Sequence, residues 1–229
     1  MNIKTIAKSI FVILLYYIFY EIMIKVMSLI GLNISDFSSL QKIITFTIFD
    51  ILLIISLYFI YKKDLKKEFL LFKNNFKEFV EKYTKYWLLG IVLMSIINSI
   101  IMFITPSDVA NNEELVRGLI DKFPLYGFFS AVLVAPFVEE IVFRKTFKDI
   151  IKNKYLLLII CGLTFGTIHV IESYTKITDL LYIFSYGVFG SVFAYIYYKT
   201  NTVFTSMFFH FIHNTMLVLI YFVSNVIWG

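Results

Sequence analysis

The stretch APFVEEIVFR, residues 135–144, places two adjacent glutamates and an arginine in an apolar run directly after a proline. An ionised side chain at the centre of a membrane helix costs roughly 3 kcal/mol on insertion scales. Such groups are therefore rare, and they face a bundle interior or a water-filled cavity. Whether Glu139, Glu140 and Arg144 lie inside a membrane decides how the whole chain folds.

The composition indicates that they do. The chain has 229 residues, of which 59% are hydrophobic and 16% charged, whereas soluble domains have about 45–50% apolar and 25% charged residues. Apolar runs close to the ~20 residues that span a bilayer recur along the whole chain. The sequence predicts an all-α, polytopic membrane bundle that forms a single domain over 1–229. The seven predicted spans are 6–30, 40–61, 86–105, 124–151, 155–171, 179–198 and 203–227.

The amino-terminal sequence resembles a signal peptide, because Lys4 and Lys8 precede an apolar run. No small-residue cleavage site follows, and the apolar run continues to Ile30, so we expect a retained first helix. The single cysteine, Cys161, lies within the fifth span, which excludes an intrachain disulfide.

Basic residues are unevenly distributed between the two sides of this arrangement. Sixteen of the 21 lysines and arginines fall on the side of the amino terminus. By the positive-inside rule, the multi-pass protein has a cytoplasmic amino terminus and a carboxyl terminus outside the cell membrane.

The segment 62–85 carries eight of these lysines. Its phenylalanines recur at helical spacing, at Phe69, Phe72, Phe76 and Phe79. An aromatic stripe beside a lysine face suits a lipid headgroup layer, so this segment is predicted to be an interfacial amphipathic helix. A solvated linker is the alternative, and neither structure is a nucleic-acid site.

Within the fourth span, helical geometry separates the two glutamates. Residues four apart share a helix face, so Glu140 and Arg144 are expected to pair. Glu139 points about 100° away from that face and is the carboxylate more able to act as a base. Pro136 cannot donate to the carbonyl of Val132, which predicts a kinked helix. A structural clasp is the alternative for the Glu140–Arg144 pair.

Two further spans carry polar groups. His169 lies in the fifth span, as far from the turn near residue 154 as Glu139, so the two side chains are expected at one level, ~22 Å from that turn. His210 and Asn214, in the seventh span, share a helix face. His213 lies on the flank of that face, where we expect packing. An interhelical hydrogen bond is the alternative for each histidine.

Close approach of the fifth span to a neighbour is also predicted. Gly162 and Gly166 form a GxxxG face, which lets helices pack tightly in lipid.

Three motifs therefore occur in order within membrane spans: E-E-x-x-x-R, F-x-x-x-H and H-x-x-x-N. Together they resemble the CPBP family, the CAAX proteases and bacteriocin-processing enzymes that are also called the Abi family and include type II CAAX prenyl endopeptidases. The resemblance covers about 124–220, which it implies is the catalytic core. The motif residues are Glu139, Glu140, Arg144, Phe165, His169, His210 and Asn214.

The resemblance implies hydrolysis of a peptide bond within the membrane, at a site reached from the cytoplasm. By this resemblance Glu139 would activate the attacking water, with His169 helping to hold it. His210 and Asn214 would stabilise the oxyanion, and the remaining acid and the arginine would order the site. If a metal is bound, zinc held by Glu139, His169 and His210 is the expected site; a metal-free glutamate–histidine pair is the alternative.

The expected partners are the lipid bilayer and a membrane-bound, lipidated or hydrophobic peptide, such as a bacteriocin or signalling-peptide precursor, and no nucleic acid. Other proteolytic designs are not supported, because H-E-x-x-H, G-x-S-x-G and G-x-G-D do not occur. Two other function classes remain open. One is a non-catalytic bacteriocin-immunity or binding protein, and the other is a transporter, which would more often show paired repeats.

Overall fold

The computed structural model describes residues 2–105 and 110–228, and this part of the chain is helical, without a β-strand. Within it, seven helical segments are long and apolar enough to cross a membrane, which confirms the predicted all-α polytopic bundle. These segments are Ile3–Leu29, Ser39–Asn74, Phe76–Ile104, Pro124–Ile150, Lys154–Ile171, Ile177–Thr200 and Val203–Asn225.

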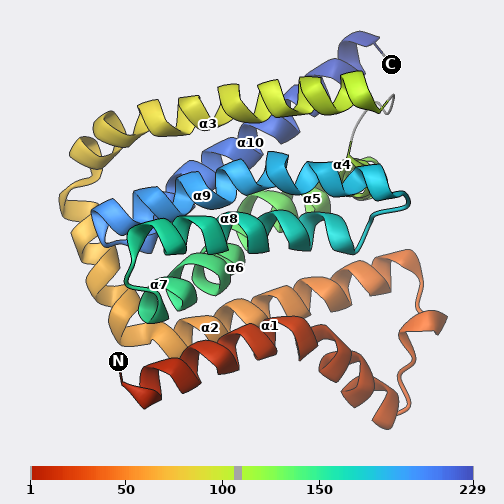
Figure 1. Cartoon of the computed structure of the whole chain (residues 1–229). Coiled ribbons are helices and arrows are strands. Elements are labelled where there is room, and N and C mark those ends of the chain that lie inside the picture. Colours follow the sequence, from red (N-terminus) through yellow and green to blue (C-terminus); the bar gives the residue numbers. More distant parts are fainter. Residues whose placement is uncertain (1, 106–109, 229) are drawn as a thin grey trace.

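The first two spans, α1 (Ile3–Leu29) and α2 (Ser39–Asn74), form a hairpin at one side of the molecule (Figure 1). A capping box begins α2: the Gln41 N–H donates to Ser38 Oγ, and the Ser38 N–H donates to Gln41 Oε1. These bonds satisfy donors that a helix start leaves unpaired. Apolar side chains four residues apart along α2 are buried in the core, at Leu53, Leu57, Tyr61 and Leu65.

The segment 62–85 is helical, as its pattern predicts, and its place at the membrane interface stays a prediction. It is divided between the end of α2 and the start of α3 (Phe76–Ile104), with a break at Asn75. Its aromatic stripe packs partly on the protein, because Phe72 and Phe76 contact Phe208 of α10 at 6.2 and 5.2 Å between ring centroids. Phe69 and Phe76 nevertheless remain 48% and 43% exposed, so part of the stripe faces outward.

The rest of the chain builds the bundle interior. A short helix α4 (Asn111–Lys122) precedes the fourth span, which consists of α5 (Pro124–Phe128), α6 (Ala135–Glu140) and α7 (Thr146–Ile150) with π-helical turns between them. Then follow α8 (Lys154–Ile171), a 3₁₀ turn (Ile177–Leu181), α9 (Tyr182–Thr200) and α10 (Val203–Trp228). Asn201, in the left-handed conformation with φ 55°, ends α9 and allows the turn into α10.

Glycines let α8 and α9 approach closely, as the GxxxG face predicts. A Cβ on Gly166 would overlap the carbonyl oxygen of Ile183, and one on Gly190 would lie 2.6 Å from the carbonyl oxygen of Cys161. Lipid gives no hydrophobic force between apolar helices, so such backbone-to-backbone packing holds membrane helices together. It also fixes His169, one turn beyond Gly166 on α8, against α9.

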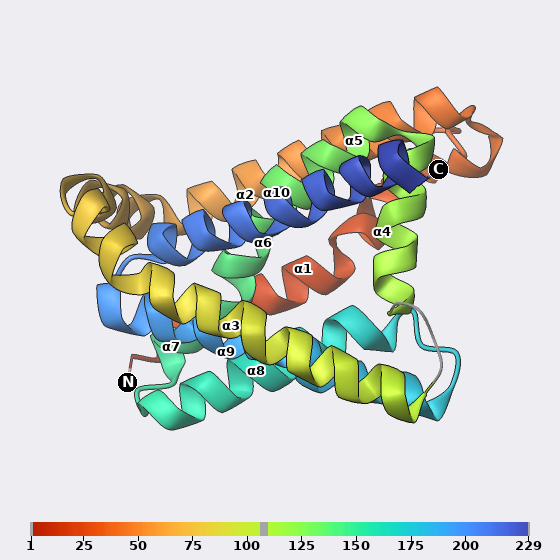
Figure 2. The same cartoon turned by 90° about the horizontal axis from the view of Figure 1, so that it is seen from above.

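The bundle has two distinct ends (Figures 1 and 2). One end holds the amino terminus and the turns α2–α3, α7–α8 and α9–α10, and we call it the lysine-rich end. It carries Lys62, Lys63, Lys66, Lys67, Lys73, Lys77, Lys145, Lys148, Lys152, Lys154 and Lys199. The other, the α4 end, holds α4, the α1–α2 and α8–α9 connections and the end of α10.

Candidate active site

Two π-helical turns flank the acidic pair, at Phe129–Val134 and Ile141–Lys145. In them the hydrogen-bond ladder shifts by one residue: the Ala135 N–H donates to Ser130, and the Thr146 N–H donates to Ile141. π-helical turns inside α-helices are frequent at functional sites. Here they replace the simple proline kink that the sequence predicts and set the directions in which Glu139 and Glu140 point.

The first π turn leaves one backbone carbonyl without a helical partner. The Ala135 N–H bonds Ser130 instead of Ala131, and the next residue, Pro136, has no N–H to give. Asn214 of α10 supplies the missing donor, because its Nδ2 donates to the carbonyl oxygen of Ala131 at 2.7 Å. Asn214 of the seventh span thus donates the hydrogen bond that Pro136 of the fourth span cannot give.

Glu140 and Arg144 form the predicted pair inside the protein. Both side chains are fully buried, and Arg144 Nη1 lies 3.3 Å from Glu140 Oε1. The guanidinium also lies over two rings, 4.1 Å from the centroid of Phe165 and 5.6 Å from that of Phe193. Two aromatic faces and one carboxylate together stabilise a charge that lipid would exclude.

His210 lies between the two glutamates. Its Nδ1 is 3.0 Å from Glu140 Oε1, and its Nε2 is 3.8 Å from Glu139 Oε2. The ring stacks on Phe193, with centroids 4.9 Å apart and an interplanar angle of 23°. Since an ionised carboxylate only accepts, the Glu140 contact places a proton on Nδ1 and turns Nε2 towards Glu139.

His169 is held differently, by its own helix. Its Nδ1 bonds the carbonyl oxygen of Phe165 at 2.8 Å, which places the ring proton on that nitrogen and leaves the Nε2 lone pair available in the neutral form. The ring lies between Phe165 and Tyr186, at 4.2 and 4.8 Å between centroids. This sandwich fixes the ring orientation.

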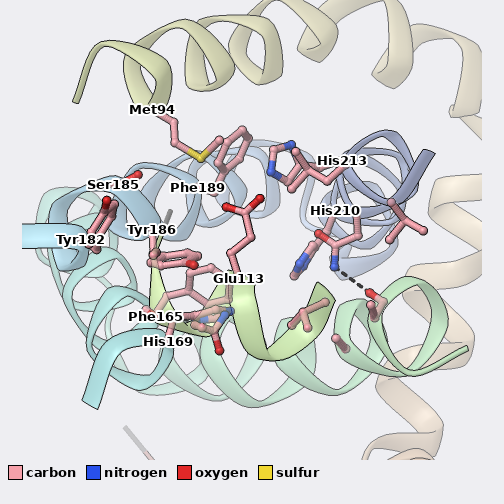
Figure 3. A pocket seen from close by; sticks show the side chains of 18 of the residues that line it. Met94, Glu113, Phe165, His169, Tyr182, Ser185, Tyr186, Phe189, His210 and His213 are labelled. Carbon is pink, nitrogen blue, oxygen red and sulfur yellow. Dashed lines mark hydrogen bonds between the residues drawn. The ribbon is translucent and has the colours of Figure 1, made fainter. Parts of the chain in front are cut away.

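A cavity of about 410 Å³ brings four of the six predicted residues together. Glu139, His169, His210 and Asn214 line it, whereas Glu140 and Arg144 lie behind it. Figure 3 shows His169 and His210 directed into this space, and the Asn214–Ala131 bond at its edge. Within the described residues, Glu139 Oε2 makes no hydrogen bond. The cavity therefore presents a carboxylate oxygen whose hydrogen bonding the fold leaves open.

The conditional zinc site does not fit this arrangement. Among the described residues, no three His, Cys, Asp or Glu side chains are placed to hold one metal ion. We therefore derive no step through a metal.

His213 also lines the cavity, although the sequence assigns it a packing role. The ring lies on Phe189, with 3.9 Å between centroids, and its Nδ1 makes no hydrogen bond within the described part of the chain. Packing and access to the cavity are thus both present, and the role of His213 stays a prediction.

Two buried carboxylates escaped the sequence reasoning. Asp50 of α2 accepts hydrogen bonds from Tyr20 and Tyr126. Glu68, near the end of α2, accepts from Lys145 at 2.6 Å. Asp50 could have been predicted as buried, because it is an acidic residue inside an apolar span. Glu68 lies in a lysine-rich segment, and nothing in that segment indicates that its side chain is buried.

Comparison with known proteins finds a family match over the region that contains this site. Residues 121–216, which include all six predicted site residues, match the family described as Type II CAAX prenyl endopeptidase Rce1-like. The chain is therefore a polytopic membrane protein with a region that matches this family's model, and the resemblance drawn from its three motifs is confirmed.

A similar protein is also named as a membrane peptidase. The protein named "Putative membrane peptidase YdiL" of Bacillus subtilis (strain 168) is 27% identical over 113 residues, which cover 48% of this chain and 43% of that protein. The match thus spans less than half of the relative's length. No solved structure matches the chain significantly.

Proposed function

We propose that the protein is an intramembrane endopeptidase that hydrolyses a peptide bond of a hydrophobic, membrane-associated peptide with water activated by Glu139. The observation that carries this proposal is the carboxylate of Glu139, with Oε2 3.8 Å from His210 Nε2, facing a cavity shared with His169 and Asn214. Residues 124–220 form the catalytic core, because every proposed active residue lies there.

The attacking water would be held by two acceptors. The Glu139 carboxylate accepts a hydrogen bond from one O–H of the water, and the Nε2 lone pair of His169 accepts one from the other O–H. As the water oxygen bonds to the substrate carbonyl carbon, its proton passes to Glu139. When the carbon–nitrogen bond breaks, Glu139 returns that proton to the leaving amine.

The oxyanion would be stabilised by His210 and Asn214. Glu140 already accepts from His210 Nδ1, so His210 donates to the oxyanion through Nε2 when the ring carries both protons. Asn214 uses one amide hydrogen for Ala131 and keeps the second for the substrate oxygen. Donors aimed at developing charge give the stabilisation that acyl transfer needs.

Glu140 and Arg144 act behind the cavity as positioning residues. Their contact holds the carboxylate that orients His210, and the arginine packs on Phe165, whose carbonyl orients His169. One buried pair thus sets the orientation of both histidines. The alternative, a non-catalytic immunity or binding protein, would not cleave peptides. An assay of peptide cleavage therefore distinguishes the two functions.

Our first prediction concerns Glu139. The purified protein in lipid nanodiscs is assayed with internally quenched peptides rich in Leu, Ile and Phe. Glu139→Gln keeps size and polarity but removes the base, so turnover falls by about 10²–10⁴-fold while peptide binding persists. The matched control, Glu114→Gln on the exposed face of α4, keeps full turnover. Near-normal cleavage by Glu139→Gln would refute the proposed base.

A further inference from the structure

His213 lines the cavity, but the proposed mechanism gives it no task. It falls within the H-x-x-x-N motif, directly before Asn214, at a position that the motif leaves open. Its ring packs on Phe189, with 3.9 Å between centroids, and Figure 3 shows the two side chains together at the wall of the cavity. The residue is only 6% exposed, so a partner for its nitrogens has to come from inside the bundle.

The chain itself does not supply that partner. Within the described residues, neither nitrogen of the His213 ring makes a hydrogen bond. Several described side chains have a buried polar atom without a partner, but just two of them line the cavity, Glu139 and His213. The proposed mechanism assigns Glu139 to the attacking water. A buried polar group without a hydrogen bond costs free energy, which a ligand that supplies the partner recovers.

The charge around His213 differs from that around His210, the other cavity histidine of α10. His210 lies 3.0 and 3.8 Å from two glutamate oxygens. In the described part of the chain, no carboxylate lies within ion-pair distance of His213. A buried imidazolium without a carboxylate is costly, so His213 is a neutral ring in which one nitrogen donates and the other accepts.

A peptide bound in the cavity needs such an acceptor. Each backbone N–H of the substrate loses its water there, and an N–H buried without an acceptor is rare in proteins. In the proposed mechanism Glu139 and His169 hold the water, and His210 and Asn214 stabilise the oxyanion. These four side chains thus act at the reacting atoms, whereas the accepting nitrogen of His213 is unused.

We propose that His213 is a substrate-binding residue whose accepting nitrogen takes a hydrogen bond from a backbone N–H of the peptide, close to the scissile bond. Along α10, His213 lies three residues past His210, which is about 4.5 Å at the helical rise. An extended peptide advances roughly 3.3–3.6 Å per residue, which places this N–H one or two residues from the bond that is cut. The proposal rests on the proposed peptidase function. It implies that substrates lack proline at this position, because proline has no N–H.

The test is a series of the quenched peptides in which one backbone N–H at a time is replaced by an ester oxygen, on each side of the scissile bond. With wild type in nanodiscs, one position should raise KM by about three- to tenfold, which is the effect of one net hydrogen bond. The kcat should stay near its original value, because this bond is made equally in the bound substrate and in the transition state. Proline at the same position should raise KM at least as much.

His213→Phe identifies the group that holds this N–H. The substitution keeps an aromatic ring against Phe189 but removes both nitrogens, so KM for the all-amide peptide should rise by the same factor of about three to ten. The ester should then add no further loss, because the hydrogen bond is already absent. His213→Leu replaces this variant if it does not fold. An unchanged KM, or an ester effect that persists in the variant, would overturn the proposal and leave His213 as a packing residue.

Two polar replacements add a rescue. The amide group of His213→Asn lies near the place of Nδ1, and that of His213→Gln near the place of Nε2, so one of the two should recover KM and thereby identify the nitrogen. Recovery by neither would contradict the proposal. The matched control is Thr215→Val, which removes a hydroxyl that lies outside the cavity and bonds the Phe211 carbonyl of its own helix. It should leave KM unchanged, and an equal rise there would show that the effect is not specific to His213.

Binding without cleavage separates the two proposals. In the Glu139→Gln background, fluorescence anisotropy of a labelled peptide gives Kd, which His213→Phe should raise by about three- to tenfold. If wild type binds the peptides but cuts none, the peptidase function fails, and this Kd still decides the role of His213. If wild type cuts them and His213→Phe changes neither KM nor Kd, the peptidase function stands and the proposed role in binding fails.

Discussion

Asn214 carries two hydrogens on its amide nitrogen, and the fold engages one of them with the carbonyl oxygen of Ala131. That carbonyl lacks a helical donor because position 136 is a proline. A buried acceptor left unpaired costs about 1–3 kcal/mol. The asparagine therefore has a structural duty in addition to its proposed catalytic one, and the two duties depend on different hydrogens.

The second prediction separates these duties with a double-mutant cycle. Asn214→Ala should lower the free energy of unfolding by about 1–3 kcal/mol and also lower kcat by ~10²–10³-fold. Adding Pro136→Ala supplies an N–H at position 136 that can bond Ala131. The double variant should then recover stability, measured as thermal unfolding in nanodiscs, but not kcat.

The outcome of the cycle identifies the role. If stability and kcat recover together, Asn214 is only an interhelical clasp, and the oxyanion donor lies elsewhere. His213→Ala, one residue away on α10, should change kcat and stability only mildly, whether its ring only packs on Phe189 or also binds the substrate backbone. A large loss in this control would instead indicate general damage to α10.

At the scale of helices, sequence pattern predicted contacts within one helix better than contacts between helices. The Glu140–Arg144 pair follows from a spacing of four and is present at 3.3 Å. The His210–Glu140 bond joins α10 to the fourth span, so no spacing within either helix could predict it. The π turns were also missed, because a proline predicts a break in the ladder but not how the neighbouring carbonyls find partners.

The GxxxG face on α8 was predictable because small residues four apart have a direct packing consequence in lipid. The third prediction tests it. Gly166→Ala should destabilise the protein by roughly 1–3 kcal/mol, because the added methyl group overlaps the backbone carbonyl of Ile183, which cannot move alone. His169, held on the same helix, should shift with it, so turnover also falls.

The matched control is Gly118→Ala, in the middle of α4, where nothing lies within 4 Å of the added Cβ. Alanine is the better helix former by about 1 kcal/mol, so this variant should be neutral or slightly stabilising. Both are measured by thermal unfolding in the same nanodiscs. Equal effects at the two glycines would show that α8 and α9 are not held by this close packing.

At the scale of the whole molecule, Glu68 and Lys145 connect parts of the chain that are far apart in sequence. Glu68 belongs to the second span, Lys145 to the fourth, and the Val203 N–H that Glu68 also binds begins the seventh. Lys145 is one of the sixteen basic residues that the sequence assigns to the side of the amino terminus, and this count does not depend on where a side chain points. Only the assembled bundle shows that this lysine is 3% exposed and closes one end of the fold.

The last prediction follows from that burial. Lys145→Met leaves Glu68 buried with an uncompensated charge, and breaking a buried pair in this way costs about 3–5 kcal/mol. The same substitution at Lys8, whose contact with Asp64 at 3.1 Å is part-exposed, at 30% and 48%, should cost at most about 1 kcal/mol. Adding Glu68→Gln to Lys145→Met removes the stranded charge and should recover part of the loss. Thermal unfolding measures each step, and kcat of the folded fraction should stay near wild type, because neither Glu68 nor Lys145 lines the cavity that holds Glu139. A fall in kcat larger than the loss of folded protein would mean that this network also positions the active site. Similar costs at Lys8 and Lys145 would mean that the bundle does not depend on the buried connection.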